Sequence, residues 1–163
     1  MIIVKGEMSM TKKIIVFDMD GTIADFYGVS GWLEDLHNES VRPYVEAKPL
    51  YSMVTLNALL NIMRNMGWHI VVTSWLSQGS TKKYDEEVRN AKKGWLARYE
   101  FPYDEIHLVK HGTTKANCTR HHGGYQILVD DNSKVRKGWS LGDTINPVED
   151  DLIEILKNLI KKA

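Results

Sequence analysis

Four short apolar runs alternate along the chain with longer stretches in which apolar residues recur at helical spacing. The runs are almost free of polar residues, a pattern typical of parallel strands that are covered on both faces. They predict strands at residues 14–17, 70–72, 106–109 and 127–129. Because strands and helices alternate, we expect an α/β protein with a three-layer, Rossmann-like fold around a central parallel sheet.

The helices between these strands are predicted from their apolar stripes and end signals. One covers residues 53–66 and is followed by Gly67, a favoured residue just beyond a helix. A second covers 81–98, with acids early and bases late, an order that complements the helix dipole. We expect a last helix to begin with Asn146 as its N-cap and Pro147 at its first position.

Residues 25–50 form the one irregular stretch, rich in glycine, proline and aromatic residues, with a short helical piece at 32–37. We interpret it as a small cap-like insertion in a single domain that spans 1–163, because the length suits one domain. Residues 1–9 precede the first strand, and we expect them to have little structural role.

Composition and charge narrow the function. The chain has 21 Lys and Arg against 21 Asp and Glu, which argues against a protein that mainly coats nucleic acid. We expect a cytoplasmic protein without a membrane partner, since no apolar run is long enough for a span or a signal peptide. A single cysteine, Cys118, excludes a disulfide within the chain. His121 and His122 suggest a metal site, but adjacent side chains point apart and no third nitrogen ligand is evident. We therefore interpret them as part of a flexible loop before Gly123.

Polar side chains follow each predicted strand at the point where it ends. The carboxyl ends of parallel strands meet at one edge of a sheet, where open α/β folds bind their ligands. We therefore expect one site that combines carboxylates, hydroxyls and an ammonium. Its candidates are Asp18 and Asp20, Thr73 and Ser74, Lys110 or Lys115, and Asp130 with Asp131.

This set of side chains suits phosphoryl transfer. Converging carboxylates repel one another unless a cation lies between them, and an all-oxygen donor set favours Mg²⁺. A hydroxyl can donate to a phosphate oxygen, and a lysine can neutralise its charge. A nucleophilic carboxylate with a second carboxylate two residues later is the arrangement for reaction through an aspartyl-phosphate.

At this level of detail the chain resembles the haloacid dehalogenase (HAD) superfamily of phosphatases. Residues 17–22, Phe-Asp-Met-Asp-Gly-Thr, are similar to its motif I, and 70–74 resemble motif II. Lys115 falls where the motif III lysine is expected, and 127–131 resemble the paired-aspartate form of motif IV. The similarity extends from residue 14 to the last helix.

The resemblance implies a role for each matched residue. Asp18 would be the nucleophile and a Mg²⁺ ligand. Asp20 would be the general acid and base, with its backbone carbonyl on Mg²⁺. Thr73 would hold the phosphoryl group, and Lys115 would stabilise its charge.

Two assignments have competitors. Lys110 lies closer to its strand end than Lys115, but residues 112–114 can turn the chain back before Lys115. Asp131 would be the third acidic ligand of Mg²⁺, with Asp130 behind it, and the reverse order stays open.

The resemblance also narrows the substrate. Residues 18–26 are similar to the opening of 5′(3′)-deoxyribonucleotidases, although the cap is shorter and Trp75 stands where that family has proline. The expected reaction is Mg²⁺-dependent hydrolysis of a phosphate monoester, such as a nucleotide 5′- or 3′-phosphate, with Ser74 and Trp75 contacting the substrate beside Thr73 and Lys115. The paired aspartates are also similar to polynucleotide 3′-phosphatase domains, which act on nucleic-acid ends. Base-stacking candidates are Phe26, Tyr27, Trp32 and Trp75.

Two other functions remain alternatives. Receiver domains use Asp, Thr or Ser and Lys around Mg²⁺, but their acidic pair follows the first strand and their phosphorylated Asp a later one. The Asp-x-Asp spacing after the first strand favours the HAD order. A non-catalytic binding or regulatory module of HAD fold is the other alternative, which the complete set of catalytic positions disfavours. The sequence leaves the oligomeric state open.

Overall fold

The computed structural model describes residues 12–162 and is built on a five-stranded sheet in the order β5-β4-β1-β6-β7. Every neighbouring pair is parallel, so the predicted α/β fold class is confirmed. The four predicted strands are present, and a two-residue fifth strand, too short for a recognisable pattern, lies at one edge. The strands are β1 (Lys13–Phe17), β4 (Trp68–Trp75), β5 (Glu105–Val109), β6 (Tyr125–Val129) and β7 (Thr144–Ile145).

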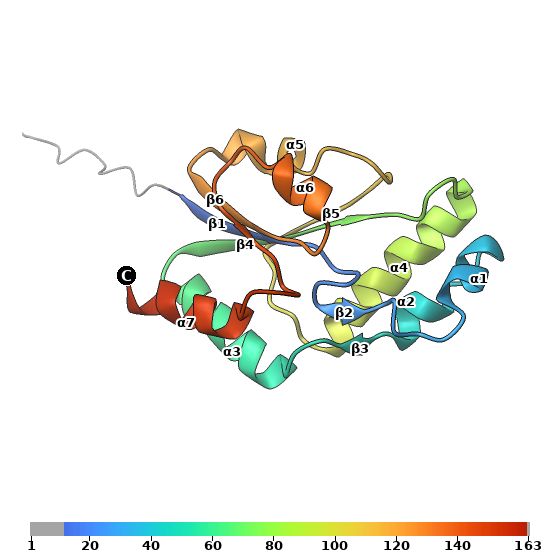
Figure 1. The fold of residues 1–163 in the computed structure, drawn as a ribbon, viewed down its shortest axis with the longest axis horizontal. Helices are drawn as coiled ribbons and strands as arrows, with labels where there is room; N and C mark the ends of the chain where they lie inside the picture. Colours follow the sequence, from blue (N-terminus) through green and yellow to red (C-terminus); the bar gives the residue numbers. More distant parts are fainter. Residues whose placement is uncertain (1–11, 163) are drawn as a thin grey trace, which may run out of the picture.

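Helices cover both faces of this sheet, which gives three layers (Figure 1). The face that carries Ile15, Phe17 and Val72 packs against α3, α4 and α7, and the opposite face packs against α5 and the end of α6. Side chains on successive strand residues point to opposite faces, so the uninterrupted apolar runs serve both layers. The helices are α3 (Met53–Asn65), α4 (Lys82–Arg98), α5 (Ala116–Thr119), α6 (Ser133–Lys137) and α7 (Leu152–Lys161).

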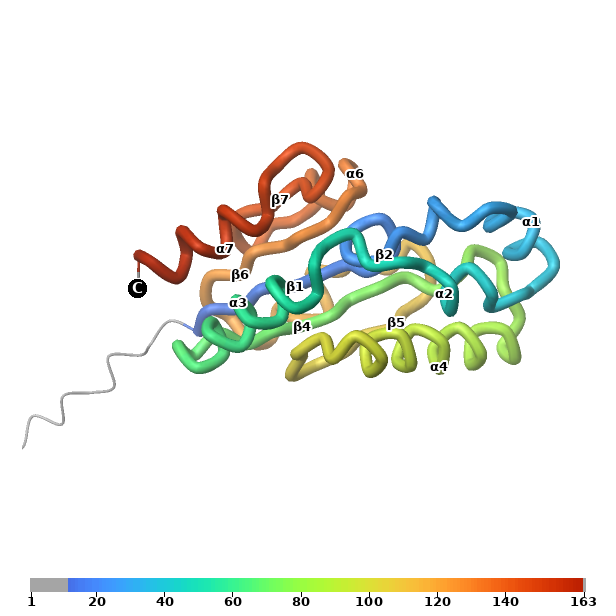
Figure 2. The backbone as a smooth tube through the Cα atoms, turned by 90° about the horizontal axis from the view of Figure 1, so that it is seen from below, coloured from blue at the N-terminus to red at the C-terminus, as the bar shows by residue number. Residues whose placement is uncertain are grey.

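The segment between β1 and α3 forms the part of the molecule beyond the carboxyl edge of the sheet (Figures 1 and 2). It contains an antiparallel pair, β2 (Ala24–Asp25) and β3 (Lys48–Pro49), and two short helices, α1 (Trp32–His37) and α2 (Arg42–Glu46). Phe26 and Tyr44 are buried in it and pack with Tyr84 and Val88 of α4. This packing fixes the segment beside the ends of β1 and β4.

Ser52 and Thr81 begin α3 and α4 by accepting hydrogen bonds from the backbone N–H groups of Thr55 and Tyr84. The last helix is present, but its predicted start was wrong. It begins at Leu152, because Asp151 is its N-cap and accepts a hydrogen bond from Glu154 N. Asn146 instead forms a turn in which its side chain accepts from Val148 N.

The loop prediction for His121 and His122 was also wrong, because they lie in a 3-10 helix, η1 (Arg120–His122). His122 Nε2 is 3.0 Å from Glu105 Oε1. These residues are 17 positions apart, so the contact cannot be predicted from the neighbours of His122 in the sequence. The prediction for residues 1–9 lies outside the described residues. Over the described range 12–162, no helix has the length and apolar character needed to cross a membrane.

Candidate active site

Asp18 is the first residue after β1 and lies at the centre of the sheet's carboxyl edge. Its backbone N–H donates to Val129 O of β6 at 3.0 Å, which holds it beside the neighbouring strand. Lys115 Nζ donates to Asp18 Oδ1 and Thr22 Oγ1 donates to Oδ2, both at 2.9 Å. Both carboxylate oxygens of Asp18 are therefore held in place by a hydrogen bond. Asp18 is buried, with 7% of its surface exposed.

Asp130 and Asp131, which follow β6, bring two further carboxylates to Asp18. One oxygen from each of the three lies within 4.8 Å of the others. Burial, followed by the charge of Asp18, raises the pKa of Asp130 to about 6 and that of Asp131 to about 7. Three carboxylates crowded in a buried site favour partial protonation unless a cation compensates them.

The chemistry of this donor set fits Mg²⁺. All three groups offer oxygen, the ligand atom that Mg²⁺ prefers, and the pocket beside them leaves room for water and substrate oxygens. Asp131 is the more open of the pair. Both Asp130 oxygens are engaged, by Lys115 Nζ at 2.7 Å and Asn132 N at 2.9 Å. Asp131 Oδ1 accepts a long hydrogen bond from Thr22 Oγ1, at 3.3 Å.

Asp20 lines the same pocket but is not part of this triad, and it pairs with Lys92, a lysine not among the predicted site residues. Lys92 Nζ donates to Asp20 Oδ2 at 2.8 Å, to Ser74 Oγ at 2.6 Å and to Trp75 O at 2.8 Å. Lys92 is 1% exposed. Burial raises the pKa of Asp20, and Lys92 opposes this rise. The spacing Tyr84, Val88, Lys92 was the available signal, since it places Lys92 on the buried face of α4.

Thr73 and Ser74 close β4 and face opposite sides of the sheet. The contact with Lys92 places Ser74 on the α4 side. Thr73 therefore lies on the same side as Asp18 and Lys115. It is fully buried, and its Oγ1 has no hydrogen-bond partner among the described residues. A buried hydroxyl without a partner is costly, although Thr73 is not among the residues that line the pocket.

The structure distinguishes the two candidate lysines by position. Lys115, directly before α5, is 4% exposed and contacts Asp18 and Asp130. Burial by itself lowers the pKa of its ammonium, but these two carboxylates outweigh burial and hold the pKa well above its ordinary value. Lys110 is exposed, at the end of β5.

A pocket of about 690 Å³ opens above Asp18, Asp20 and Asp131, between the strand ends and the segment that joins β1 to α3. Of its aromatic residues, Phe26 is 3% exposed and packs on Tyr44 with ring centroids 4.7 Å apart, which makes it part of the core. Tyr27 is 53% exposed. Trp75 is half-buried, donates from Nε1 to Thr113 O at 2.8 Å and lies under Lys115 Nζ, 5.3 Å from the ring centroid.

Comparison with known proteins adds support for the fold. No family model matches the sequence, and no curated protein matches it. Solved structures do. The D,D-heptose 1,7-bisphosphate phosphatase from Burkholderia thailandensis superposes with a TM-score of 0.55 and 18% identity, over 91% of this chain and 99% of that one. This chain has its fold.

Two further structures come from Pnkp1/Rnl/Hen1 complexes, one of them described as an RNA repair complex. Their TM-scores are 0.56 and 0.55, at 14% and 18% identity, over 84% and 82% of this chain. This chain spans 46% and 42% of those chains, which is less than half of their length. At such identities the likeness extends to the fold alone.

Proposed function

We propose that the protein is a Mg²⁺-dependent phosphohydrolase that cleaves phosphate monoesters through a phosphate bound covalently to Asp18. The observation that carries this proposal is the setting of Asp18: a buried carboxylate held by Lys115 and Thr22, next to Asp130 and Asp131, at the floor of an open pocket. A purely structural ion pair would not need three carboxylates at one pocket.

The first chemical step transfers the phosphoryl group to Asp18. An Asp18 carboxylate oxygen attacks phosphorus, and the bond from phosphorus to the ester oxygen breaks. Asp20, whose pKa is raised by burial, gives its proton to the leaving oxygen. Thr73 and Lys115 donate hydrogen bonds to the phosphoryl oxygens, where negative charge builds up.

The second step returns the enzyme to its starting form. A water molecule attacks phosphorus, Asp20 takes up a proton from it, and the bond between phosphorus and Asp18 breaks to release inorganic phosphate. Asp18, Asp131 and the backbone carbonyl of Asp20 would hold Mg²⁺, which neutralises phosphate charge when bound. Lys92 keeps the Asp20 carboxylate directed into the pocket.

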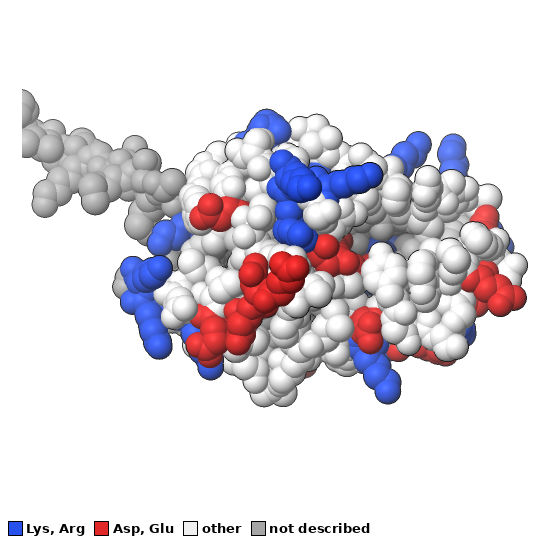
Figure 3. Space-filling view, viewed as in Figure 1, with Lys and Arg blue, Asp and Glu red and all other residues white. Residues whose placement is uncertain are grey.

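The substrate class we propose is a phosphate monoester of a nucleotide, free or at the end of a nucleic-acid strand. Tyr27 and Trp75 line the pocket with aromatic surface within reach of a base. Lys134, Arg136 and Lys137 of α6 lie next to the motif that carries Asp130. Figure 3 shows Lys and Arg side chains gathered in this region of the surface, close to acidic ones. The fold likeness to a chain of an RNA repair complex makes strand ends a reasonable class to test.

The test is phosphate release from an aryl phosphate and a substrate panel, with wild type beside Asp18→Asn. The panel contains nucleoside 5′- and 3′-monophosphates, 3′-phosphorylated oligonucleotides and a sugar bisphosphate. We expect release that requires Mg²⁺ and Asp18, with the highest kcat/KM on a nucleotide or a strand end. Equal release by wild type and Asp18→Asn would contradict the phosphohydrolase, and a preference for the sugar bisphosphate would contradict the substrate class.

A further inference from the structure

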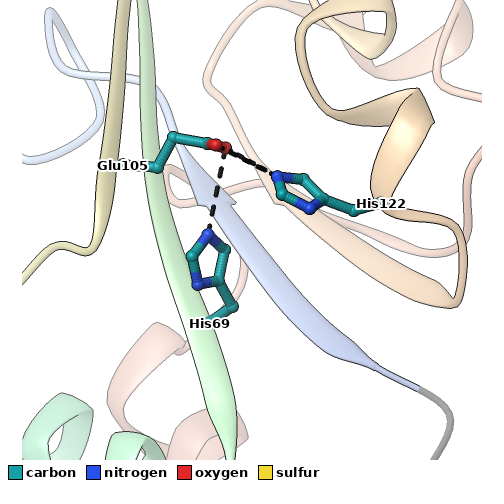
Figure 4. Close-up of side chains that lie close together, drawn as sticks. All are labelled: His69, Glu105 and His122. Atoms are coloured by element: carbon teal, nitrogen blue, oxygen red, sulfur yellow. Dashed lines mark hydrogen bonds and ion pairs between the residues drawn. The ribbon is translucent and has the colours of Figure 1, made fainter.

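Three potential metal ligands converge at the amino-terminal edge of the sheet (Figure 4). His69 is the second residue of β4, Glu105 is the first of β5, and His122 is the last of η1. One donor atom from each lies within 4.8 Å of the other two. Figure 4 shows both imidazoles directing a nitrogen at the Glu105 carboxylate.

The spacing of these atoms is close to that of a tetrahedral metal site. His122 Nε2 lies 3.0 Å from Glu105 Oε1, and His69 Nε2 lies 3.9 Å from Oε2. Ligands bound to one tetrahedral Zn²⁺ at roughly 2.0–2.1 Å are separated by about 3.3 Å. The His69 nitrogen would have to approach Glu105 Oε2 by about 0.6 Å to reach that separation.

His69 lacks a partner for the nitrogen that faces this group. Its Nε2 is buried and accepts or donates no hydrogen bond among the described residues. Its Nδ1 lies 3.9 Å from Asp104 Oδ2, and Asp104 is itself fixed by Arg64 and by Ile70 N. Metal-bound histidines commonly direct their second nitrogen at a carboxylate in this way.

The position and chemistry of the group separate it from the Asp18 site. His69 precedes Thr73 by four residues on β4, about 13 Å along an extended strand, and Thr73 is level with Asp18. The Asp18 site offers oxygen alone. Two imidazoles and one carboxylate are a mixed set that suits Zn²⁺ and its neighbours in the first transition series rather than Mg²⁺.

We propose that His69, Glu105 and His122 bind one Zn²⁺ ion, which cross-links β4, β5 and η1. The ion would accept the lone pair of His69 Nε2 and compensate the charge of Glu105. His107 Nε2 lies 3.2 Å from Glu105 Oε2, but it is not part of the group whose donor atoms all lie within 4.8 Å of one another. Since η1 directly follows α5, the cross-link would fix the segment that begins with Lys115. The proposal does not depend on the proposed function.

One contact has to change when the ion binds. Lys12 Nζ donates to His122 Nδ1 at 2.9 Å, which leaves the ring proton on Nε2 facing Glu105. When a metal binds Nε2, the ring proton has to be on Nδ1. A protonated Nδ1 cannot accept a hydrogen bond from the Lys12 ammonium, so this contact is lost. Lys12 is exposed and can turn into solvent, so we expect Lys12→Gln to bind Zn²⁺ at least as tightly as wild type.

The test uses the full chain without a histidine tag, treated with EDTA and kept in excess Mg²⁺ to fill the Asp18 site. Zn²⁺ is titrated in competition with a coloured chelator, and Co²⁺ reports coordination through its visible spectrum. We expect one Zn²⁺ per chain and binding weakened at least about 100-fold in His69→Ala and in His122→Ala. His37→Ala, an exposed histidine of α1, is the matched control and should bind as wild type does.

Two measurements keep the result decisive. Circular dichroism establishes that each variant is folded, and Glu105→Gln, which preserves shape, replaces any alanine variant that is not. Thermal melting of wild type with and without Zn²⁺ should give an increase in Tm that His69→Ala lacks. No Zn²⁺ binding by wild type, or loss of binding in Asp18→Asn but not in His69→Ala, would overturn the proposal. Because the readout is binding, a chain without phosphatase activity would leave it intact.

Discussion

Lys92 Nζ and Asp20 Oδ2 are 2.8 Å apart, although 72 positions separate the two residues in the sequence. The ion pair joins the buried face of α4 to the loop after β1, and Ser74 accepts a second hydrogen bond from the same ammonium. A lysine in this place favours the charged form of the carboxylate and so lowers the pKa that burial raises. Lys92 therefore positions the proposed general acid and limits how firmly it holds its proton.

Replacing this lysine tests that role. In Lys92→Met the pKa of Asp20 should rise further, because burial remains and the opposing charge is lost. The pH profile of kcat/KM should move to higher pH, and kcat should fall by roughly 10- to 100-fold, less than the whole acid–base contribution. Lys93→Met, its exposed neighbour on α4, is the control and should change neither. If activity fell but the pH profile did not move, Lys92 would stabilise the fold without influencing the pKa of Asp20.

The parts of the molecule that depend on local pattern were predictable from the sequence. The four main strands and helices α3 and α4 follow from apolar periodicity, and Ser52 and Thr81 supply local caps. Strand β7 has two residues, too few to form a pattern. At the last helix, Asn146 precedes Pro147 and an acidic stretch, and Asp151 ends that stretch. The signal that favours Asp151 as the cap is Glu154 three residues later, at the start of the apolar stripe.

The side-chain environment of the site was predictable only where strand ends define it. Asp18, Asp130 and Asp131 follow β1 and β6, neighbours in the sheet, so their convergence follows from the topology. Lys92 reaches the site from the middle of a helix. His69 and His122 meet because a strand start and a 3-10 helix happen to pack together, which no spacing along the chain indicates.

A pair of lysine variants tests which ammonium serves the phosphoryl group. Lys115→Met should lower kcat/KM by about 100-fold or more, because it removes a donor aimed at developing charge. Lys110→Met should retain wild-type activity, since its side chain is exposed at the end of β5. Steady-state kinetics on an aryl phosphate measure both variants. Loss of activity in Lys110→Met but not in Lys115→Met would assign the phosphoryl contact to Lys110.

Gly21 tests how tightly the metal-binding group is packed. It has φ +79°, and a Cβ at this position would overlap Asp131 Oδ2 and approach Tyr27 Cε2 to 2.9 Å. Gly21→Ala should therefore displace Asp131 and raise the Mg²⁺ concentration for half-maximal activity at least about tenfold, equivalent to about 1.4 kcal/mol.

Gly67→Ala is the control for the backbone cost of that substitution. Gly67 has φ +96° with no atom within 4 Å of an added Cβ, so it carries the strain of a left-handed backbone without the overlap. It should lower Tm and leave the Mg²⁺ dependence unchanged. An equal change in Mg²⁺ dependence in both variants would mean that contact with Asp131 is not the cause.

Binding of Mg²⁺ should stabilise the protein more at neutral than at acidic pH. Asp130 and Asp131 have pKa values raised to about 6 and about 7. Without a cation, their contribution to stability is largest below the unfolded pKa near 3.8 and is lost as pH rises through the raised values. Mg²⁺ binds the ionised forms and offsets that loss, whereas protons compete with it at low pH.

The expected result is an increase in Tm with Mg²⁺ that is larger at about pH 7.5 than at about pH 5.5. Asp131→Asn, which removes one charge from the site, should reduce the increase at the higher pH. Thermal melting with and without Mg²⁺, at matched ionic strength, measures this increase in Tm at each pH. An increase of the same size at both pH values would place Mg²⁺ elsewhere on the protein.

The most direct test of the central claim is to find the phosphate on Asp18. Asp20→Asn is mixed with an aryl phosphate, whose good leaving group needs no general acid, so the covalent species forms and then lacks the base for its hydrolysis. After acid quenching, peptide mass spectrometry should locate Mg²⁺-dependent phosphate on Asp18 and none in a variant that also carries Asp18→Asn. Phosphate release without any labelled Asp18, or label on another residue, would contradict the account.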